Sequence, residues 1–392
     1  MKKSTLFKRN INAIALSLLF LASTQTVFAD TAEPAPANPY SSTHTVVLDD
    51  GTSLDIVIAS SPALPPQQKL AAKSAAVSPV AAIGDVKIAG VPAFAWSYGS
   101  SNTAGAMIAG YYDRAGFANM YTGPTDGGCM PLTNSNWGNS DKDLGGHECP
   151  LSATRQGVDG RTTRGHVDDY YVQEGTIGPD PYVVNTWTEH AAGECTGDYM
   201  KTSKWFPGSS SVLPGLAEDI NRDGAAVFIF DLTGFPVTAS YLESIGYAQY
   251  DAGYGLKLFF ESRGYTVSTM YNQYIAPLET AGFTYAQYKA EIDAGRPVML
   301  HLSGHIVVGI GYNNLTNSET DNKIIFHDSY DYVDHTMNWG GVYYSAADPN
   351  HLFPFTHNAV TIVTLADAID PSAGCGKKFP WAMFLPTIIG PK

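Results

Sequence analysis

The spacing of apolar residues changes along the chain from a helical period to a strand period. After residue 99, apolar side chains recur at the i, i+3, i+4, i+7 spacing of one buried helical face: Ala104, Met107, Ile108 and Tyr111. The Gly-Ser-Ser-Asn run over 99–102 offers several N-cap residues, so we expect this helix to begin there. A second helix is predicted over 284–294, because Gly295 follows it and glycine favours a helix end.

Three apolar runs rich in β-forming residues follow the second helix. They span 297–302, 305–312 and 323–327, with short links between them. Consecutive strands with short links pair most simply as an antiparallel meander. An early helix and a late sheet predict an α+β fold, in which the N-terminal helix packs on the late antiparallel sheet.

A hairpin is predicted before this main stretch. The runs 46–48 and 54–58 flank Asp50-Gly51, and glycine readily adopts the positive φ of a tight turn. Residues 59–82 are rich in Pro, Ala and Ser, which is typical of a linker. We therefore expect an accessory arm or propeptide at 30–85, a main domain at 86–366 with an elaborated middle region at 126–284, and a C-terminal tail at 367–392.

The first 29 residues have the pattern of a bacterial export signal. Basic residues precede an apolar run over 11–22, and Val27-Phe28-Ala29 resembles a cleavage site. Without this segment the formal charge falls from −14 to −18, since four positive charges leave with it. Nucleic-acid binding needs a basic footprint, and no later apolar stretch approaches the roughly 20 residues of a membrane span. We expect a secreted or periplasmic protein that binds no nucleic acid and has no membrane span.

The chain contains four cysteines: Cys129, Cys149, Cys195 and Cys375. Export favours disulfide bonds over free thiols. Four cysteines allow three pairings, and the sequence does not choose among them. No two are separated by only two residues, the spacing found in structural zinc sites.

A histidine and a carboxylate on the late strands are candidates for catalysis. If Tyr312 pairs with Lys323, then His305 lies opposite Tyr330. Asp328 shares a face with Tyr330 and lies diagonally from His305, within the roughly 7–8 Å at which such cross-strand neighbours interact. A carboxylate there can fix the tautomer of the imidazole and stabilise its charged form. A register slip of one residue would turn Asp328 away.

Five sequence blocks occur in a fixed order: Val91-Pro92, Trp96-Ser97-Tyr98-Gly99-Ser100-Ser101-Asn102-Thr103-Ala104, Gly110-Tyr111-Tyr112-Asp113, Gly304-His305-Ile306-Val307-Val308-Gly309-Ile310-Gly311-Tyr312 and His327-Asp328-Ser329. Together they resemble the secreted relatives of the bacteriocin-processing, double-glycine peptidases. The resemblance implies a papain-like cysteine-peptidase fold and a peptide or protein ligand. It also implies that His305 is the catalytic base and that Asp328 orients it.

The nucleophile position departs from that family. The residue after the glycine is cysteine in the family, but here it is Ser100. A thiol at a helix N-terminus is partly ionised, whereas a serine hydroxyl must lose its proton during the attack. The family's glutamine, a donor to the oxyanion six residues before its cysteine, is replaced by Phe94. We therefore expect a catalytically impaired protein that retains a peptide-binding cleft.

Two other functions remain open. One is an active hydrolase with Ser100 as nucleophile, His305 as base and Asp328 as its orienting residue. The other is a structural or adhesive envelope protein, held by two disulfides and calcium. The same three residues also have ordinary structural interpretations, as an N-cap, a hydrogen-bonded strand residue and a turn cap. His301 and His327 are alternative imidazoles, and the oligomeric state does not follow from the sequence.

A polar run over 219–224 matches half of a calcium-binding loop. Asp219, Asn221 and Asp223 stand at positions one, three and five, with glycine at six. Phe230 stands at position twelve, where an acidic ligand is expected, so a polar turn is the alternative to a calcium site. Residues 165–170 and 187–190 also concentrate histidines and carboxylates, as metal ligands or as a solvated acidic loop. No other cofactor is indicated.

Overall fold

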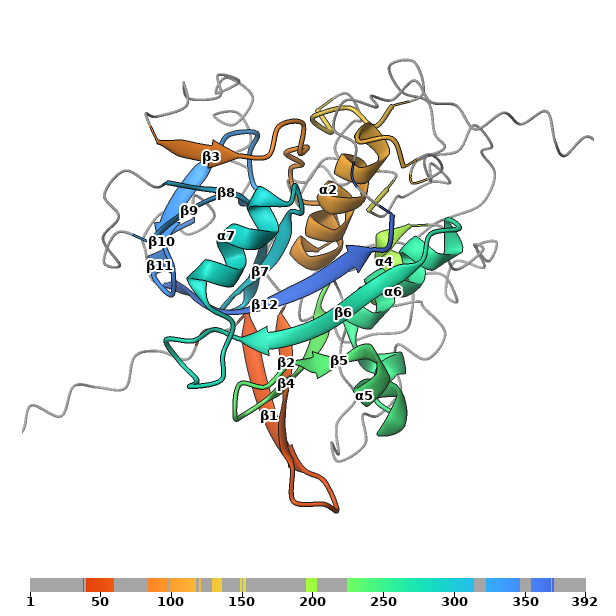
Figure 1. The fold of residues 1–392 in the computed structure, drawn as a ribbon, viewed down its shortest axis with the longest axis vertical. Coiled ribbons are helices and arrows are strands. Elements are labelled where there is room, and N and C mark those ends of the chain that lie inside the picture. Colours follow the sequence, from red (N-terminus) through yellow and green to blue (C-terminus); the bar gives the residue numbers. More distant parts are fainter. Residues whose placement is uncertain are drawn as a thin grey trace, which may run out of the picture. The chain divides into compact units, whose positions relative to one another are not determined.

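The computed structural model describes residues 38, 40–59, 84–97, 99–117, 120, 129–135, 149, 151–152, 195–202, 224–313, 322–345, 354–367 and 369 (Figure 1). The predicted export signal at 1–29 and most of the predicted tail lie outside these residues. The described part combines helices with mostly antiparallel strands, as the predicted α+β class requires. This arrangement is compatible with a papain-like fold.

A nine-stranded sheet is the largest element of the fold. Its strands are paired in the order β10-β9-β8-β7-β12-β6-β5, with β11 on β12 and β3 on β8. The bounds are β3 (Asp85–Lys87), β5 (Val237–Thr238), β6 (Val267–Tyr274), β7 (Val298–Leu302), β8 (His305–Asn313), β9 (Lys323–His327), β10 (His335–Asn338), β11 (Val342–Tyr343) and β12 (Phe355–Leu365). Strands β7, β8 and β9 form the predicted meander, and β12 inserts between β7 and β6.

The pairing of β8 with β9 changes register at a β-bulge. Near the connecting loop Tyr312 pairs with Ile324, so the predicted pairing of Tyr312 with Lys323 is wrong by one residue. The register shifts between Gly309 and Gly311, and beyond the bulge Val308 pairs with His327. That pair belongs to the predicted register, because the bulge inserts one extra residue into β8. The end of the strand that carries His305 therefore has the register that the sequence predicts.

Five α-helices lie around the sheets in the described residues. They are α2 (Ser100–Arg114), α4 (Thr196–Met200), α5 (Ala239–Ser244), α6 (Ala252–Ser262) and α7 (Tyr285–Asp293). Helix α7 is the predicted second helix: Thr284 forms a capping box with Gln287, and Gly295 follows with φ +72°. The middle region also supplies β5, α5, α6 and β6, so much of it belongs to the main sheet and its cover.

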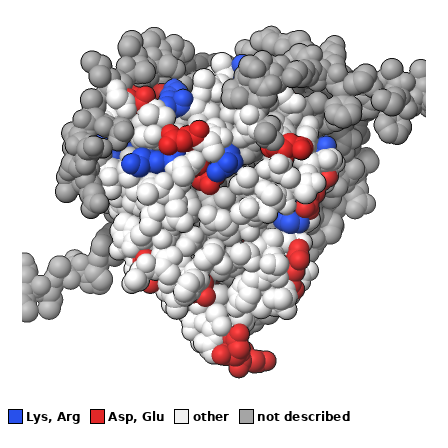
Figure 2. Space-filling view, in the orientation of Figure 1, with Lys and Arg blue, Asp and Glu red and all other residues white. Residues whose placement is uncertain are grey.

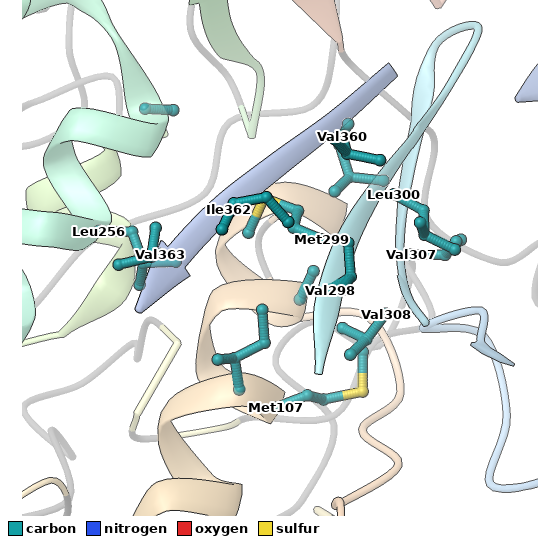
Figure 3. Close-up of a cluster of buried hydrophobic side chains, with 14 of the residues drawn as sticks. Met107, Leu256, Val298, Met299, Leu300, Val307, Val308, Val360, Ile362 and Val363 are labelled. Atoms are coloured by element: carbon teal, nitrogen blue, oxygen red, sulfur yellow. The ribbon is translucent and has the colours of Figure 1, made fainter. Parts of the chain in front are cut away.

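Helices α2 and α7 cover opposite faces of strand β8. Val308 and Gly309 are adjacent in β8, so their side-chain directions point to opposite faces. Met107 of α2 points toward Val308 (Figure 3). A Cβ at Gly309 would lie 2.8 Å from the ring of Tyr288 in α7. The absent side chain at Gly309 thus lets α7 approach the sheet closely.

Helix α2 is buried along almost its whole length. Every residue from Ser100 to Asp113 is buried, including those outside the predicted apolar face. The N-cap is Gly99 with φ +133°, so the helix begins within the predicted run, and Ser100 is its first residue and not its cap. A Cβ at Gly99 would lie 2.5 Å from the carbonyl oxygen of Gly224. Glycine is required because the helix start is packed against another backbone.

The predicted N-terminal hairpin is present and joins the rest of the fold. Strands β1 (Ser41–Val47) and β2 (Ser53–Ala59) pair antiparallel around Gly51, which has φ +87°. Strand β2 also pairs with β4 (Ala226–Asp231), which makes a three-stranded sheet. Leu54 and Ile56 are fully buried in the core. The segment expected to be an accessory arm or propeptide therefore contributes to the packing of the main domain.

The charge distribution agrees with the acidic composition. Figure 2 shows an acidic group at the turn of the β1–β2 hairpin, where the chain carries Asp49 and Asp50. On the face drawn there, Lys and Arg atoms of the described residues lie among acidic ones and form no extended basic surface. Within the described helices, none is both long and apolar enough to cross a membrane.

We predict that Gly99→Ala destabilises the protein by about 3 kcal/mol or more. Part of this cost is the left-handed φ, at about 1–2 kcal/mol, and the rest is the displacement of the Gly224 backbone. Gly246→Ala is the matched control, because Gly246 has φ +74° and a Cβ there would meet nothing within 4 Å. Urea unfolding of both variants measures the difference, and equal losses would contradict a packed helix start.

Candidate functional site

Ser100 lies at the start of α2 and contacts the first residues of β8. Its Oγ accepts a hydrogen bond from the backbone N–H of Ile306, at 3.2 Å. Ile306 follows His305 directly, so two of the three predicted site residues lie beside each other although 205 positions separate them in the sequence. Ser100 is only 1% exposed, which leaves its hydroxyl buried at the seam between helix and strand.

His305 is a fully buried imidazole held by the loop after β9. Its Nε2 lies 2.8 Å from the backbone oxygen of Asp328, and its ring stacks on Tyr330 with centroids 4.7 Å apart. Within the described residues, Nδ1 has no hydrogen-bond partner. Burial lowers the pKa of His305 to about 4, although Asp328 acts in the opposite direction. The ring is therefore neutral at pH 7, and one of its nitrogens is available.

The carboxylate of Asp328 points away from His305. Its Oδ1 accepts the backbone N–H groups of Tyr330 and Asp331, and its Oδ2 accepts the hydroxyl of Tyr343 at 2.6 Å. The contact between Asp328 and His305 thus runs through the backbone oxygen of Asp328 and not through the predicted carboxylate. A backbone carbonyl can fix the tautomer of an imidazole, but it does not carry the full charge that stabilises an imidazolium.

The backbone of the loop over 328–331 brings the Asp328 carbonyl and the Tyr330 ring to the imidazole of His305. Ser329 adopts a left-handed conformation with φ +61°, which is uncommon outside glycine. This residue lies between Asp328, whose backbone oxygen faces the imidazole, and Tyr330, whose ring stacks on it. The left-handed turn therefore allows two nearly consecutive residues to contact the same ring, at a cost in backbone strain.

A second histidine balances the buried charge of Asp328. His335 Nε2 lies 3.0 Å from Asp331 Oδ1 and 3.5 Å from Asp328 Oδ2. Burial alone lowers the pKa of His335, but the two carboxylates outweigh it and raise the pKa to about 9. The pKa of Asp328 is lowered, because the charge of His335 and its hydrogen bonds outweigh its burial. His335 is therefore a partly buried cation at pH 7 that compensates the aspartate.

The same three side chains have ligand atoms suited to a metal ion. The ligand atoms of Asp328, Asp331 and His335 lie within 4.8 Å of one another. Both Asp328 oxygens already accept hydrogen bonds, and the proton on His335 supplies the positive charge. Asp219, Asn221 and Asp223 of the predicted calcium loop lie outside the described residues, as do 165–170 and 187–190.

The two alternative imidazoles are engaged elsewhere. His301 Nε2 lies 2.7 Å from Thr361 Oγ1, and its ring packs edge-on against Phe228. His327 bridges the backbone oxygen of Pro92 and the carboxylate of Asp334, at 2.8 and 3.1 Å. Both histidines thus have structural partners, whereas His305 is the one next to the start of α2.

The replacement of the expected oxyanion donor is visible in the packing. Phe94 is fully buried, and its backbone N–H faces the sulfur of Met107 at 3.3 Å. The neighbouring amide of Asn102 donates to the backbone oxygen of Ser97 and to Ser152 Oγ. Both Asn102 donor hydrogens therefore hold the loop before α2 together, and the buried ring of Phe94 stands where the sequence resemblance leads us to expect a glutamine.

The described cysteines are buried, and Cys149 is a thiol. Cys129, Cys149 and Cys195 are at most 6% exposed, and Cys375 lies outside the described residues. Cys149 is not disulfide-bonded, and burial raises its pKa to about 12. The expectation that all four cysteines form two disulfides is therefore wrong for this structure, because Cys149 takes part in none. The buried, protonated Cys149 is also a poor nucleophile.

Comparison with family models finds a match to part of the chain. Residues 210–345 match the model of the Peptidase_C39 like family. The matched stretch contains His305 and Asp328. Ser100 lies outside it, on its N-terminal side. The match supports a bacteriocin-processing type of peptidase family and hence a peptidase-like protein. No curated protein and no solved structure gives a match.

Sequence reasoning missed the residues that hold Asp328. Tyr343 and His335 both contact its carboxylate, and no local motif points to either of them. Asp331 and His335 have an i, i+4 spacing, but they flank a turn and not a helix. Strand β10 returns antiparallel along β9, which brings His335 back beside Phe326. Only the strand pairing reveals the cluster.

We predict that His335 stabilises the fold in a pH-dependent way. Its folded pKa, about 9, lies above the ordinary value of 6.5, so its contribution is fully present below about pH 6.5 and is lost as the pH rises through 9. The side chain is 20% exposed, and the contribution is at most about 3 kcal/mol.

Urea unfolding of the native protein and of His335→Asn from pH 6 to pH 10 tests this. The stability difference between the two proteins should shrink as the pH rises. Burial raises the pKa of Asp251 to about 7, but Asp251 titrates in both proteins and cancels in the difference. A difference that is constant over this range would show that His335 carries no compensating charge.

Proposed function

We propose that this chain is an exported, peptidase-like protein with a papain-like fold whose hydrolytic chemistry is impaired. Its inherited site consists of Ser100, His305 and Asp328. The family match over 210–345 supports the peptidase kinship, and the contact between the α2 start and β8 joins the unmatched serine to the matched histidine.

The hydrogen bond of Ser100 carries this proposal. A working serine nucleophile needs a base that takes its proton during the attack. In the described residues the hydrogen bond of Ser100 Oγ is to the Ile306 N–H and not to His305. The N–H of Ile306 engages a lone pair of the oxygen that would attack a substrate. Ser100 therefore has a structural role: its hydrogen bond links the start of α2 to strand β8.

The electrostatics of His305 support the same conclusion. A general base is most effective when its pKa lies near the working pH. Burial holds the pKa of His305 near 4, and the carboxylate that would stabilise its charged form is directed at Tyr343 and His335. A base of this strength removes a serine proton poorly, which adds to the loss of the thiol.

Peptide binding is the function that we propose the site retains. Ser100, His305 and Asp328 are each at most 1% exposed, so a peptide reaches them only after the surrounding loops move. The aromatic rings of Tyr330 and Phe355 flank His305, with centroids 4.7 and 5.3 Å from its ring. Aromatic rings suit contacts with the side chains of an extended peptide, and a peptide is the partner that the family match favours.

An active serine hydrolase is the second candidate. It is favoured by one observation: His305 Nδ1 is buried, lacks a partner in the described residues and belongs to the residue next to the one that contacts Ser100. A rotation of the Ser100 hydroxyl toward this nitrogen would create the base contact that the mechanism needs.

A fluorophosphonate probe distinguishes the two candidates. We predict that the native protein is not labelled at neutral pH, because the Ser100 hydroxyl is buried and lacks an engaged base. Labelling that disappears in Ser100→Ala would instead establish the active hydrolase. Mass spectrometry of the intact protein gives the readout, with Ser101→Ala as the matched control.

Restoring the thiol tests the inherited geometry. We predict that Ser100→Cys reacts with iodoacetamide at least about tenfold faster than Ser101→Cys, because only position 100 combines the α2 start with the neighbouring imidazole. Position 101 is equally buried, and the native protein reports the background from its own buried thiol Cys149. Equal rates at the two positions would mean that the site no longer has the arrangement of a cysteine peptidase.

A further inference from the structure

A separate cavity of about 310 Å³ lies at the other end of helix α2. It is bounded by α2, by the residues between α7 and β7, and by the end of β12. The lining residues that would face a ligand are Tyr112, Ala294, Arg296, Leu365, Asp367 and Ile369. Tyr112 is twelve residues after Ser100, which places it about 18 Å along the helix at 1.5 Å per residue. The cavity is therefore distinct from the candidate peptidase site.

Tyr112 lines this cavity and carries a buried hydroxyl, which a ligand contacts only when the wall of the cavity moves aside. The residue is fully buried, and its ring packs edge-on against Phe117 and Phe260. Its hydroxyl has no hydrogen-bond partner among the described residues. A buried hydroxyl without a partner lowers the stability of the fold, and an acceptor that enters the cavity would remove this cost. Burial also raises the pKa of Tyr112, which keeps the hydroxyl a hydrogen-bond donor.

Arg296 brings a positive charge with free donors to the same cavity. Its Nε and one Nη2 hydrogen are paired with the carboxylate of Glu291, at 2.5 and 3.0 Å. Within the described part of the chain, Nη1 makes no hydrogen bond, so one edge of the guanidinium remains for a second acceptor. Glu291 holds the fork in place, which prepares that edge for a ligand.

We propose that this cavity binds the carboxylate of a small organic acid with a short apolar chain, through Arg296 Nη1 and the Tyr112 hydroxyl. A carboxylate accepts hydrogen bonds from both groups and gives each of these donors an acceptor. Ala294, Leu365 and Ile369 supply apolar walls for the rest of the molecule. The volume is at the lower end for small-molecule sites, which limits the ligand to a few carbon atoms.

Two classes of ligand have the required carboxylate and short apolar chain, and they differ in one further group. A simple acid such as hexanoate presents only the carboxylate and the apolar chain. A free apolar amino acid such as leucine adds an ammonium group, which Asp367 in the cavity lining can face. Hexanoate, leucine and the neutral analogue hexanamide therefore form one set of probes.

Isothermal titration of the full chain with each probe, at constant ionic strength, tests the proposal. We expect saturable binding of hexanoate or leucine and none of hexanamide. Tighter binding of leucine than of hexanoate identifies an amino-acid ligand, and the reverse order identifies a simple acid. Absence of saturable binding for both carboxylates, or equal binding of hexanamide, would overturn the proposal.

Tyr112→Phe separates a ligand contact from a structural role. It removes only the unpartnered hydroxyl, so the unliganded protein should melt at the same temperature or higher. Carboxylate affinity should fall about tenfold or more, because a hydrogen bond to a charged group is lost. Unchanged affinity in this variant would show that Tyr112 does not contact the ligand.

Arg296→Gln tests the charge in the same cavity. It should abolish measurable carboxylate binding, whereas Lys289→Gln should leave it unchanged. Lys289 is the matched control, because it carries the same charge on α7 but contacts the rings of Tyr285 and Tyr312 outside the cavity. Equal losses in both variants would mean that overall charge, and not the cavity, attracts the acid. Neither result depends on the function of the peptidase site.

Discussion

The closed seam between the start of α2 and strand β8 is the constraint on which the rest of the structure depends. The first four residues of α2 are polar, yet all of them are buried, so their polar atoms depend on partners inside the protein; Ser101 Oγ and Asn102 Oδ1 have none among the described residues. Ser100 accepts from Ile306, and Thr103 donates to the backbone oxygen of Gly99 at 2.6 Å. This seam fixes the distance from the helix to His305. It also excludes water from the position at which a nucleophile would have to work.

The buried charge of Asp328 shapes the other side of the site. A carboxylate in this environment is tolerated because four donors surround it, two from the backbone and two from Tyr343 and His335. These contacts direct the carboxylate away from His305 and leave the backbone oxygen of Asp328 to hold the ring. Asp328 thus lies beside His305, but its carboxylate is bonded to other partners, and its charge raises the pKa of His305 by less than burial lowers it.

Local sequence signals predicted the elements that depend on local chemistry. The α2 helix, the capped α7 helix, the Gly51 hairpin and the three-stranded meander all follow from spacing, capping and turn residues. Strands β4, β6 and β12 were not predicted, because their place in the sheets depends on pairing with distant partners. The proximity of His305 to the α2 start came from the resemblance of sequence blocks, whereas the direction of the Asp328 side chain was set by Tyr343 and His335, which no local pattern connects to it.

The bulge in β8 keeps two registers apart within one pair of strands. An extra residue between Gly309 and Gly311 separates the half of the strand near the β8–β9 connection from the half that ends at His305. The glycines on both sides are closely enclosed, because a Cβ at Gly309 would lie 2.8 Å from the ring of Tyr288 and a Cβ at Gly311 would lie 2.5 Å from the backbone oxygen of Val86. The change of register is therefore confined to one short stretch of the strand. The alignment of His305 with the loop after β9 depends on the inner half of this strand pair, and the outer half carries a different register without displacing the imidazole.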